Sequence, residues 1–343
     1  AEAQPQKYGA SDPPRALFYH GTNQDRVLPM NVREEVEAAV DRIGPLVRRT
    51  PIEPASMLGE NAYFKCENFQ ATGSFKVRGA TNALLSLRPD ARVRGVVTAS
   101  SGNHGLGLAR AATQLGIPAT VFVPTLADDS KVDAIKKLGV TVERVGDDCV
   151  DTEAYARMLA EHQVRTYVSP YNDPAIIAGQ GTIGHELLQQ IPGLGAVFVS
   201  IGGGGLISGI GGYLKSVRPD IQIIGCSPAA SPAMHNCLQR GKIVDVHCHP
   251  TLSDATAGGV EPGAITFEAC RDVIDRSLLV GEAEIARAVR DVISTHHMLI
   301  EGAAGVAVAG FRQVAAEFAD TPSAIVLCGA NIGQAALKQV ISV

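Results

Sequence analysis

Short apolar runs and amphipathic segments alternate along much of the chain, first between Arg94 and Val168. The runs are typical of buried strands, and the amphipathic segments carry apolar residues at helical spacing. Regular alternation of this kind predicts parallel strands joined by helical crossovers, here a unit of about four strands. The predicted strands are Gly95–Ala99, Ala119–Val123, Thr141–Val145 and Arg165–Val168, and the helices between them are Leu106–Leu115, Asp129–Leu138 and Asp151–His162.

A second alternating series starts near Ile176, and its less regular part, Ser227–Glu261, is predicted to be rich in loops. Before the first series, the pattern predicts a helix over Val32–Ile43, a strand over Ala62–Cys66 and a helix over Val77–Leu87, which Pro89 stops. The second series predicts strands at Ala196–Ser200, Gln222–Cys226, Ser277–Val280 and Ser323–Leu327, helices at Ile176–Gln190, Leu206–Ser216, Glu282–His296 and Gly302–Phe318, and a final short helix.

A chain of 343 residues is expected to form two domains, because single hydrophobic cores rarely grow that large. Residues 95–172 form the predicted small domain, and residues 1–94 together with 173–343 form the large one. The cleft between two such domains is the usual place for a small-molecule site. Residues 1–29 are polar and contain proline, so they are predicted to form a flexible arm.

Charge and composition narrow the classes of partner and compartment. The net charge is −5 and there is no basic block, so nucleic acid is not expected as a partner. The seven cysteines are odd in number and dispersed, which is typical of reduced thiols in a cytoplasmic protein. The uncharged run from Ile191 to Leu214 is interrupted by Pro192 and many glycines, so no membrane span is predicted, and the N-terminus lacks the apolar stretch of a signal peptide.

The stretch Ser100-Ser101-Gly102-Asn103-His104 lies between a predicted strand and a predicted helix. Backbone N–H groups and the helix dipole at such a junction can bind a carboxylate, with the two hydroxyls and the amide beside them. Ser and Asn are also favoured as ordinary helix caps. These residues alone fit either interpretation equally.

Four consecutive glycines, Gly202, Gly203, Gly204 and Gly205, follow the predicted strand Ala196–Ser200 and open a helix. Glycine lets backbone amides close around a phosphate at this position. The run lacks the lysine of a nucleoside triphosphate loop. We therefore predict a phosphate-binding loop of another kind, rather than a merely flexible one.

Three other sequence features are not interpreted as ligand-binding or metal sites. The GxGxxG run Gly179–Gly184 has no strand directly before it and no acid about twenty residues later, so it is not interpreted as a dinucleotide fingerprint. His247-Cys248-His249, near Cys237 and Asp254, matches no common zinc spacing and is predicted to be a surface loop, and no metal site is expected. Glu301 starts a predicted helix and is interpreted as an acid that complements the helix dipole.

Lys76 stands on a predicted turn, directly after Phe75 and two residues after Ser74. Burial favours the neutral, nucleophilic form of a lysine, so this residue is a candidate for Schiff-base formation. For an arbitrary lysine, a solvated surface position would be the better interpretation.

Taken together, Ser74-Phe75-Lys76, Ser100-Ser101-Gly102-Asn103-His104 and Gly202–Gly205 resemble the three signatures of the fold-type II pyridoxal-phosphate enzymes. The nearest group is the serine/threonine dehydratases and serine racemases, including hydroxyectoine-utilisation, phenylserine and threo-hydroxyaspartate dehydratase-like members. The resemblance extends from about Arg48 to Leu327. It implies an α/β fold like that of the tryptophan synthase β-subunit, with two open, mostly parallel twisted sheets flanked by helices.

The resemblance also implies roles for individual residues. Lys76 would anchor pyridoxal 5′-phosphate and act as the base, Phe75 would pack against the pyridine ring, and Asn103 would bind the ring hydroxyl. The loop Gly202–Gly205 would hold the phosphate, and Cys328 would face the ring nitrogen. The residues expected to bind the substrate carboxylate are Ser100, Ser101, Gly102 and His104, and Ser101 is also a candidate catalytic acid.

The function that the resemblance implies is α,β-elimination of water from L-serine, L-threonine or a bulkier β-hydroxy amino acid, by a cytoplasmic homodimer. A thiol at Cys328 would not hold a proton on the ring nitrogen, which favours loss of the β-hydroxyl over racemisation. The turn after Gln222–Cys226 lacks the acid that helps many family members to bind a cation. The alternatives are a racemase, a β-replacement synthase and a non-catalytic ligand-binding protein.

Overall fold

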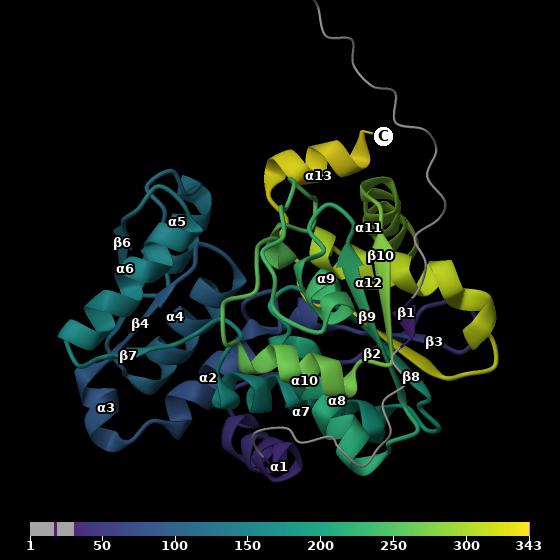
Figure 1. Ribbon diagram of the computed structural model, residues 1–343, viewed down its shortest axis with the longest axis horizontal. Coiled ribbons are helices and arrows are strands. Elements are labelled where there is room, and N and C mark those ends of the chain that lie inside the picture. The colour runs from purple at the N-terminus through teal and green to yellow at the C-terminus, as the bar shows by residue number, and fades with distance from the viewer. Residues whose placement is uncertain (1–16, 19–30, 343) are drawn as a thin grey trace, which may run out of the picture.

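The computed structural model describes residues 17–18 and 31–342, and their strands form two sheets (Figure 1). The larger sheet has seven strands in the order β1-β10-β9-β8-β11-β3-β2. The end strands β1 and β2 pair antiparallel, and the strands between them are parallel. Their bounds are β1 Leu17–Phe18, β2 Ile52–Pro54, β3 Ala62–Lys65, β8 Ala196–Ser200, β9 Gln222–Pro228, β10 Arg276–Val280 and β11 Ser323–Val326. Apart from β1, the predicted flexible arm lies outside the described residues.

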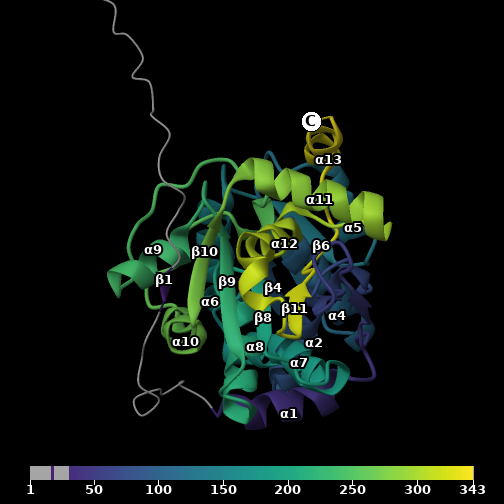
Figure 2. The same ribbon diagram turned by 90° about the vertical axis from the view of Figure 1, so that its right-hand side faces the viewer.

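Helices cover both faces of the larger sheet (Figure 2). On one side lie α1, α7, α8 and α10, and on the other lie α11 and α12, with α13 packed on α11. Their bounds are α1 Val32–Ile43, α7 Pro174–Gln190, α8 Gly205–Val217, α10 Ile265–Val273, α11 Glu282–His296, α12 Gly302–Val314 and α13 Gln334–Ile341, and α9 (Ala233–Arg240) packs against α10. The inner strands are therefore buried on both faces, which explains their continuous apolar runs.

The GxGxxG run lies inside α7, where it serves helix packing. A Cβ at Gly181 would lie 2.9 Å from the Gly209 carbonyl oxygen in α8, and a Cβ at Gly209 would lie 2.3 Å from the Ile177 carbonyl oxygen. Glycine at both positions lets α7 and α8 approach backbone to backbone. The rejection of a dinucleotide fingerprint is consistent with this position, since no strand leads into the run.

The smaller sheet has four parallel strands, as the alternation predicted, and their order is β6-β5-β4-β7. Helices α4 and α5 cover one face and α6 covers the other. The bounds are β4 Val96–Ala99, β5 Ala119–Val123, β6 Thr141–Arg144 and β7 Thr166–Tyr167, with α4 Asn103–Leu115, α5 Asp129–Lys136 and α6 Cys149–His162.

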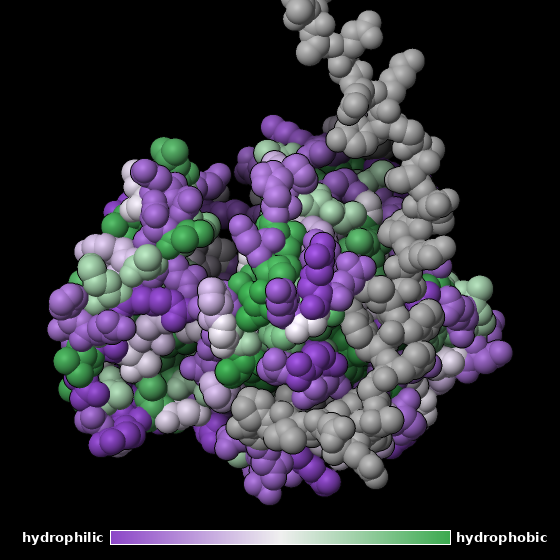
Figure 3. Space-filling view, in the orientation of Figure 1, coloured by the Kyte–Doolittle hydropathy of each residue, from purple (hydrophilic) through white to green (hydrophobic). Residues whose placement is uncertain are grey.

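One apolar cluster joins the two sheet layers. Ala80 and Leu84 on α2 (Lys76–Ser86) pack with Leu108 on α4 and Ile176 on α7, and all four are fully buried. Helix α2 therefore lies between the layers, where Figure 1 shows it. In the space-filling view the surface is hollowed between the part with the smaller sheet and the rest of the molecule (Figure 3).

Several elements differ from the predictions. Pro89 opens a further helix, α3 (Pro89–Arg94), because proline is well suited to the first turn of a helix. The segment Ser227–Glu261 contains α9 besides its loops, and α10 follows it, although its sequence shows no clear strand–helix alternation. None of the helices in the described part of the chain combines the length and apolar character that a membrane crossing needs.

Candidate active site

The turn that carries Lys76 is held by a segment far along the chain. Ser74 forms a β-bridge with Gly329, and the Phe75 N–H donates to the Cys328 carbonyl at 3.0 Å. Gly73 has a φ of 71°, which favours glycine, and its carbonyl accepts from the Ala330 N–H. The lysine turn and the Cys328 region therefore form one unit of structure.

Lys76 is the first residue of α2, and its side chain points into the protein. The Nζ atom donates to the Pro170 carbonyl at 2.6 Å and lies 5.3 Å from the centre of the Phe75 ring. Burial lowers the pKa of Lys76 to about 8, although Cys328 and Glu301 oppose the shift. A sizeable fraction of its amine is therefore neutral near physiological pH.

The glycine loop runs from the end of β8 into α8, as predicted. Gly204 has a φ of 89° and Gly205 is the first helical residue, so the loop presents a helix N-terminus. The loop packs closely against Tyr171, since a Cβ at Gly203 would lie 2.5 Å from the ring. Tyr171 directly follows Pro170, whose carbonyl accepts the bond from Lys76. The loop and the lysine amine thus flank the same short segment.

Ser100, Ser101 and Gly102 lie half-buried at the start of α4. The Gly102 N–H donates to Ser100 Oγ at 3.2 Å, and the space around a Cβ built on Gly102 is open. These residues leave room for a ligand above the helix N-terminus, where unpaired N–H groups favour an anion.

The ring of His104 contacts a backbone carbonyl. Its ring is buried and its Nε2 lies 3.1 Å from the Val168 carbonyl oxygen. Burial, together with Lys76, lowers the pKa of His104 to about 3, so the ring is neutral. A carbonyl only accepts, so Nε2 carries the proton and Nδ1 has none to donate. The side chain of His104 is therefore not placed as a donor to a substrate carboxylate.

Asn103 lies at the centre of a buried polar group. Its Nδ2 donates to both oxygens of Glu301, at 2.9 and 3.0 Å, and its Oδ1 accepts from Asn331 Nδ2 at 2.6 Å. The Asn331 N–H donates to the same carboxylate at 3.0 Å. Burial raises the pKa of Glu301 to about 7, although the hydrogen bond from Asn103 lowers it.

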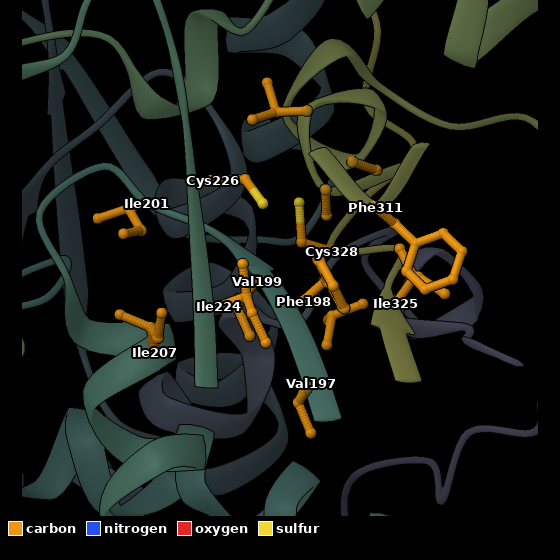
Figure 4. Close-up of a cluster of buried hydrophobic side chains, with 14 of the residues drawn as sticks. Val197, Phe198, Val199, Ile201, Ile207, Ile224, Cys226, Phe311, Ile325 and Cys328 are labelled. Atoms are coloured by element: carbon orange, nitrogen blue, oxygen red, sulfur yellow. The ribbon is translucent and has the colours of Figure 1, made fainter. Parts of the chain in front are cut away.

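Cys328 lies two residues after β11, among buried apolar side chains (Figure 4). Its thiol accepts from Ser200 Oγ at 3.5 Å, and Ser200 is the last residue of β8 before the glycine loop. Burial and the nearby Glu301 carboxylate raise the pKa of Cys328 well above its usual range. The thiol is therefore uncharged at neutral pH.

These contacts connect the predicted residues. The chain of contacts runs from Lys76 through Pro170 and Tyr171 to the glycine loop, and from Ser200 through Cys328 and Glu301 to Asn103. Ser101 stands at the N-terminal end of α4, just before Asn103.

His247, Cys248 and His249 form part of a loop, as predicted. The two histidine rings contact each other edge to face at 4.7 Å, and Cys248 Sγ donates to the Val246 carbonyl. Within residues 17–18 and 31–342, no group of three or more His, Cys, Asp or Glu side chains is arranged to hold a metal ion.

The family model for "Pyridoxal-phosphate dependent enzyme" matches residues 43–329. The chain belongs to this family. L-threonine ammonia-lyase from Geobacter sulfurreducens is 40% identical to this pyridoxal-phosphate enzyme over 89% of this chain and 77% of its own length.

Solved structures of family members confirm the predicted fold. The processed form of threonine deaminase isoform 2 from Solanum lycopersicum has a TM-score of 0.88 at 30% identity, over 97% of this chain and 98% of that one. Maize serine racemase has a TM-score of 0.84 at 30% identity, over 90% of this chain and 96% of that one. The predicted relationship to threonine dehydratases and serine racemases is thus also confirmed, as is pyridoxal 5′-phosphate as the cofactor.

The residues of the site fit pyridoxal 5′-phosphate. Lys76 offers an amine that faces a carbonyl rather than a carboxylate, so no anion holds its proton directly. The glycine loop provides backbone N–H groups at a helix N-terminus for a phosphate. Thr72 Oγ1 and Ser74 Oγ are buried beside the lysine and have no hydrogen-bond partner within the described residues. Buried polar atoms of this kind suit a polar ligand.

Two residues of the buried polar group were not predicted as site residues. Glu301 was interpreted as an acid that complements the helix dipole, and Asn331 was not assigned a role. One signal for Glu301 was present in the sequence, because a single carboxylate stands among the apolar and small residues of Ile300–Gly305. Such a residue needs a buried partner, which the sequence does not name.

Proposed function

We propose that this enzyme eliminates water from L-threonine or L-serine, and that water then hydrolyses the elimination product to a 2-oxo acid and ammonia. The observation that carries the proposal is the place of Lys76, whose amine has no carboxylate partner and a lowered pKa, on a turn bonded to the backbone of the uncharged Cys328. L-threonine ammonia-lyases supply the reaction type, since they share up to 40% identity with most of this chain. The proposal also includes a bulkier β-hydroxy amino acid as the substrate.

Different residues of the chain would hold different parts of the cofactor. Lys76 would attach it, Phe75 would pack beside its ring and Asn103 would bind the ring hydroxyl. The N–H groups of Gly202–Gly205 would hold the phosphate, which would gain from the positive end of α8. When bound, pyridoxal 5′-phosphate supplies an electron sink for a carbanion at the substrate α-carbon.

Lys76 is the proposed base that takes the proton from the substrate α-carbon. Its lowered pKa suits this step, because a base works best with a pKa near the operating pH. The uncharged Cys328 would lie near the ring nitrogen and would not stabilise a proton there. This would favour loss of the β-hydroxyl over racemisation.

The N-terminus of α4 is the proposed place for the substrate carboxylate. Ser100 and Ser101 provide hydroxyls and the segment Ser101–His104 provides backbone N–H groups around open space. In this proposal His104 contributes through its backbone, because its ring is held by Val168.

A substrate panel tests the proposal. Purified enzyme is incubated with L-serine, L-threonine, L-threo-hydroxyaspartate and L-phenylserine, and 2-oxo acid, ammonia and D-enantiomer are followed separately. We expect equal amounts of 2-oxo acid and ammonia from at least L-threonine or L-serine. D-enantiomer without 2-oxo acid would replace the ammonia-lyase with a racemase, which the similarity to maize serine racemase makes the second candidate. Absence of both products and of visible cofactor absorbance would indicate a non-catalytic ligand-binding protein.

Three further features belong to this proposal. Residues 95–172 form a small domain, residues 1–94 and 173–343 form a large one, and the active site lies between the two domains.

The enzyme is a homodimer, which light scattering of the purified protein tests. It works in a reducing compartment such as the cytoplasm, because all seven cysteines lie in the described part of the chain and are free thiols.

A further inference from the structure

Glu301 is a buried carboxylate to which the proposed reaction assigns no role. It is 2% exposed and lies at the N-cap of α12, yet its side chain makes no capping hydrogen bond. Instead the carboxylate faces Asn103 and the Asn331 N–H. A Cβ at Gly329 would lie 2.7 Å from it, so glycine is needed there for the carboxylate to come this close.

Hydrogen bonds determine the orientation of the side-chain amides of Asn103 and Asn331. A carboxylate and a carbonyl only accept hydrogen bonds. Glu301 therefore requires Asn103 Nδ2 on its side, and the Thr72 carbonyl requires Asn331 Nδ2, at 2.8 Å. Asn331 Nδ2 in turn faces Asn103 Oδ1. Acceptor groups thus fix the orientation of both amides, and the hydrogen bond between the two amides is compatible with both orientations.

This arrangement leaves a donor available on Asn103. An amide nitrogen carries two hydrogens, and Glu301 takes one of them in a bond shared between its oxygens. The second hydrogen remains for a ligand. If the amide were reversed, it would present an oxygen, which cannot donate to the ring oxygen of the cofactor.

We propose that Glu301 is a positioning residue that orients the Asn103 amide so that one N–H donates to the ring oxygen of pyridoxal 5′-phosphate. The inference rests on the role proposed for Asn103. It also gives a reason for a buried acid here, since a carboxylate presents only acceptors to Asn103 Nδ2 and so acts in the same direction as the bond from Asn331 Nδ2.

Charged groups on several elements surround Glu301. Lys76 on α2 attracts it, Asp254 opposes its ionisation, and Lys131 on α5 favours it. Cys328 Sγ lies 4.0 Å from Glu301 Oε1 and is uncharged. Glu301 therefore supplies negative charge next to the site, and protonating it removes that charge and weakens its hydrogen bond from Asn103. The strength with which Glu301 holds the Asn103 amide accordingly depends on pH.

The test is Glu301→Gln, which keeps the size of the side chain and removes its charge. Apoprotein is titrated with pyridoxal 5′-phosphate over a range of pH, and both the dissociation constant and the visible absorbance of the bound cofactor are recorded. We expect affinity to fall about tenfold, the equivalent of one hydrogen bond to a charged group. We also expect the absorbance to lose a pH-dependent change that the wild type shows.

Two further variants and a stability measurement make the test decisive. Asp148→Asn is the control, because Asp148 is likewise an acid at the N-cap of a helix, where it accepts from the Val150 and Asp151 N–H groups of α6 and lies outside the site. It should leave affinity and absorbance unchanged. Asn103→Ala is the reference for loss of the donor. Since burial raises the pKa of Glu301, its ionised form opposes folding, so Glu301→Gln should not lower the melting temperature at about pH 8.

Each outcome has one meaning. If Glu301→Gln binds cofactor with wild-type affinity and pH dependence while Asn103→Ala does not, the inference is wrong and the proposed function stands. If Asn103→Ala is also unchanged, the role of Asn103 fails and the inference fails with it. A lower melting temperature for Glu301→Gln with unchanged cofactor absorbance would make Glu301 a structural acid only.

Discussion

The amines of Lys76 and Lys65 both lie inside the protein. Their hydrogen-bond partners differ, which indicates different roles for the two lysines. The Lys65 amine is bonded to Glu186, Gln190 Oε1 and the Thr50 carbonyl, so all its donors are used and a carboxylate holds its charge. The Lys76 amine donates to a single carbonyl. A lysine without a direct carboxylate partner gives up its proton more readily, so Lys76 is the one suited to attach a cofactor.

Replacement of Lys76 should therefore remove function without removing the fold. Lys76→Ala is expected to lose turnover and the visible absorbance of attached cofactor, while circular dichroism stays that of the wild type. Lys136→Ala, on the exposed surface of α5, is the control and should keep both. Retained turnover in Lys76→Ala would refute the assignment of this lysine.

The lowered pKa of Lys76 also predicts how cofactor attachment depends on pH. Only the neutral amine attacks, and burial lowers its pKa to about 8. The rate of attachment to apoprotein should rise about tenfold per pH unit below that value and level off above it. Stopped-flow absorbance measures this rate. A profile that keeps rising to the pKa of an exposed lysine would show that Lys76 is not shifted.

At the scale of elements, helix α2 is fixed close to the lysine by a buried ionic network. Arg78, two residues after Lys76, contacts Glu67 through two bonds of 2.8 Å and Glu186 through bonds of 2.7 and 3.0 Å. Arg78 is 1% exposed and Glu67 is fully buried. The network ties α2 to α7 and to the segment after β3, which restricts movement of the lysine turn.

Breaking this network should be costly. Arg78→Met leaves two carboxylates, at Glu67 and Glu186, without their shared cation, so unfolding free energy should fall by about 3–5 kcal/mol. Arg33→Met is the matched control, because Arg33 pairs with Glu37 on the exposed face of α1 and should change stability by less than about 1 kcal/mol. Urea denaturation measures both. A similar small loss in the two variants would mean that the buried network does not stabilise the fold.

Hydrophobic periodicity predicts some helices and strands accurately and misses others. The predicted bounds of β5, β8 and α11 match the structure to the residue, because hydrophobic periodicity in these segments is strong. Helices α9 and α10 were missed. They lie outside the regular alternation, in and after a segment with many Pro, Ser and His residues, and tertiary packing around Cys237, Phe267 and Cys270 stabilises them.

At the scale of the whole molecule, two ion pairs connect the small-sheet layer with the segment beside the glycine loop. Lys131 on α5 contacts Asp254 at 3.1 Å, and Arg157 on α6 contacts Glu261 at 2.7 Å. Glu261 also binds the Tyr171 hydroxyl through its backbone N–H. These contacts connect the two parts of the molecule.

Loosening this connection should affect substrate binding more than chemistry. Glu261→Gln removes a partly exposed pair worth less than about 1 kcal/mol, so KM should rise about threefold while kcat stays close to that of the wild type. Glu153→Gln is the control, because Glu153 contacts the same Arg157 from within α6. Steady-state kinetics on the accepted substrate measure both. Equal KM values in the two variants would contradict a role for the connection between layers.

The amino-acid sequence by itself determined the features that contiguous residues encode. Strand–helix alternation, the four-stranded unit, the glycine loop after β8 and the turn before Lys76 all follow from local periodicity and backbone requirements. Only the tertiary structure decided which groups face each other across long separations. Asn103 and Glu301 are 198 residues apart, and Arg78 and Glu186 are 108 apart. A buried polar group must find a partner, but its identity depends on how the sheets and helices pack, which periodicity does not encode.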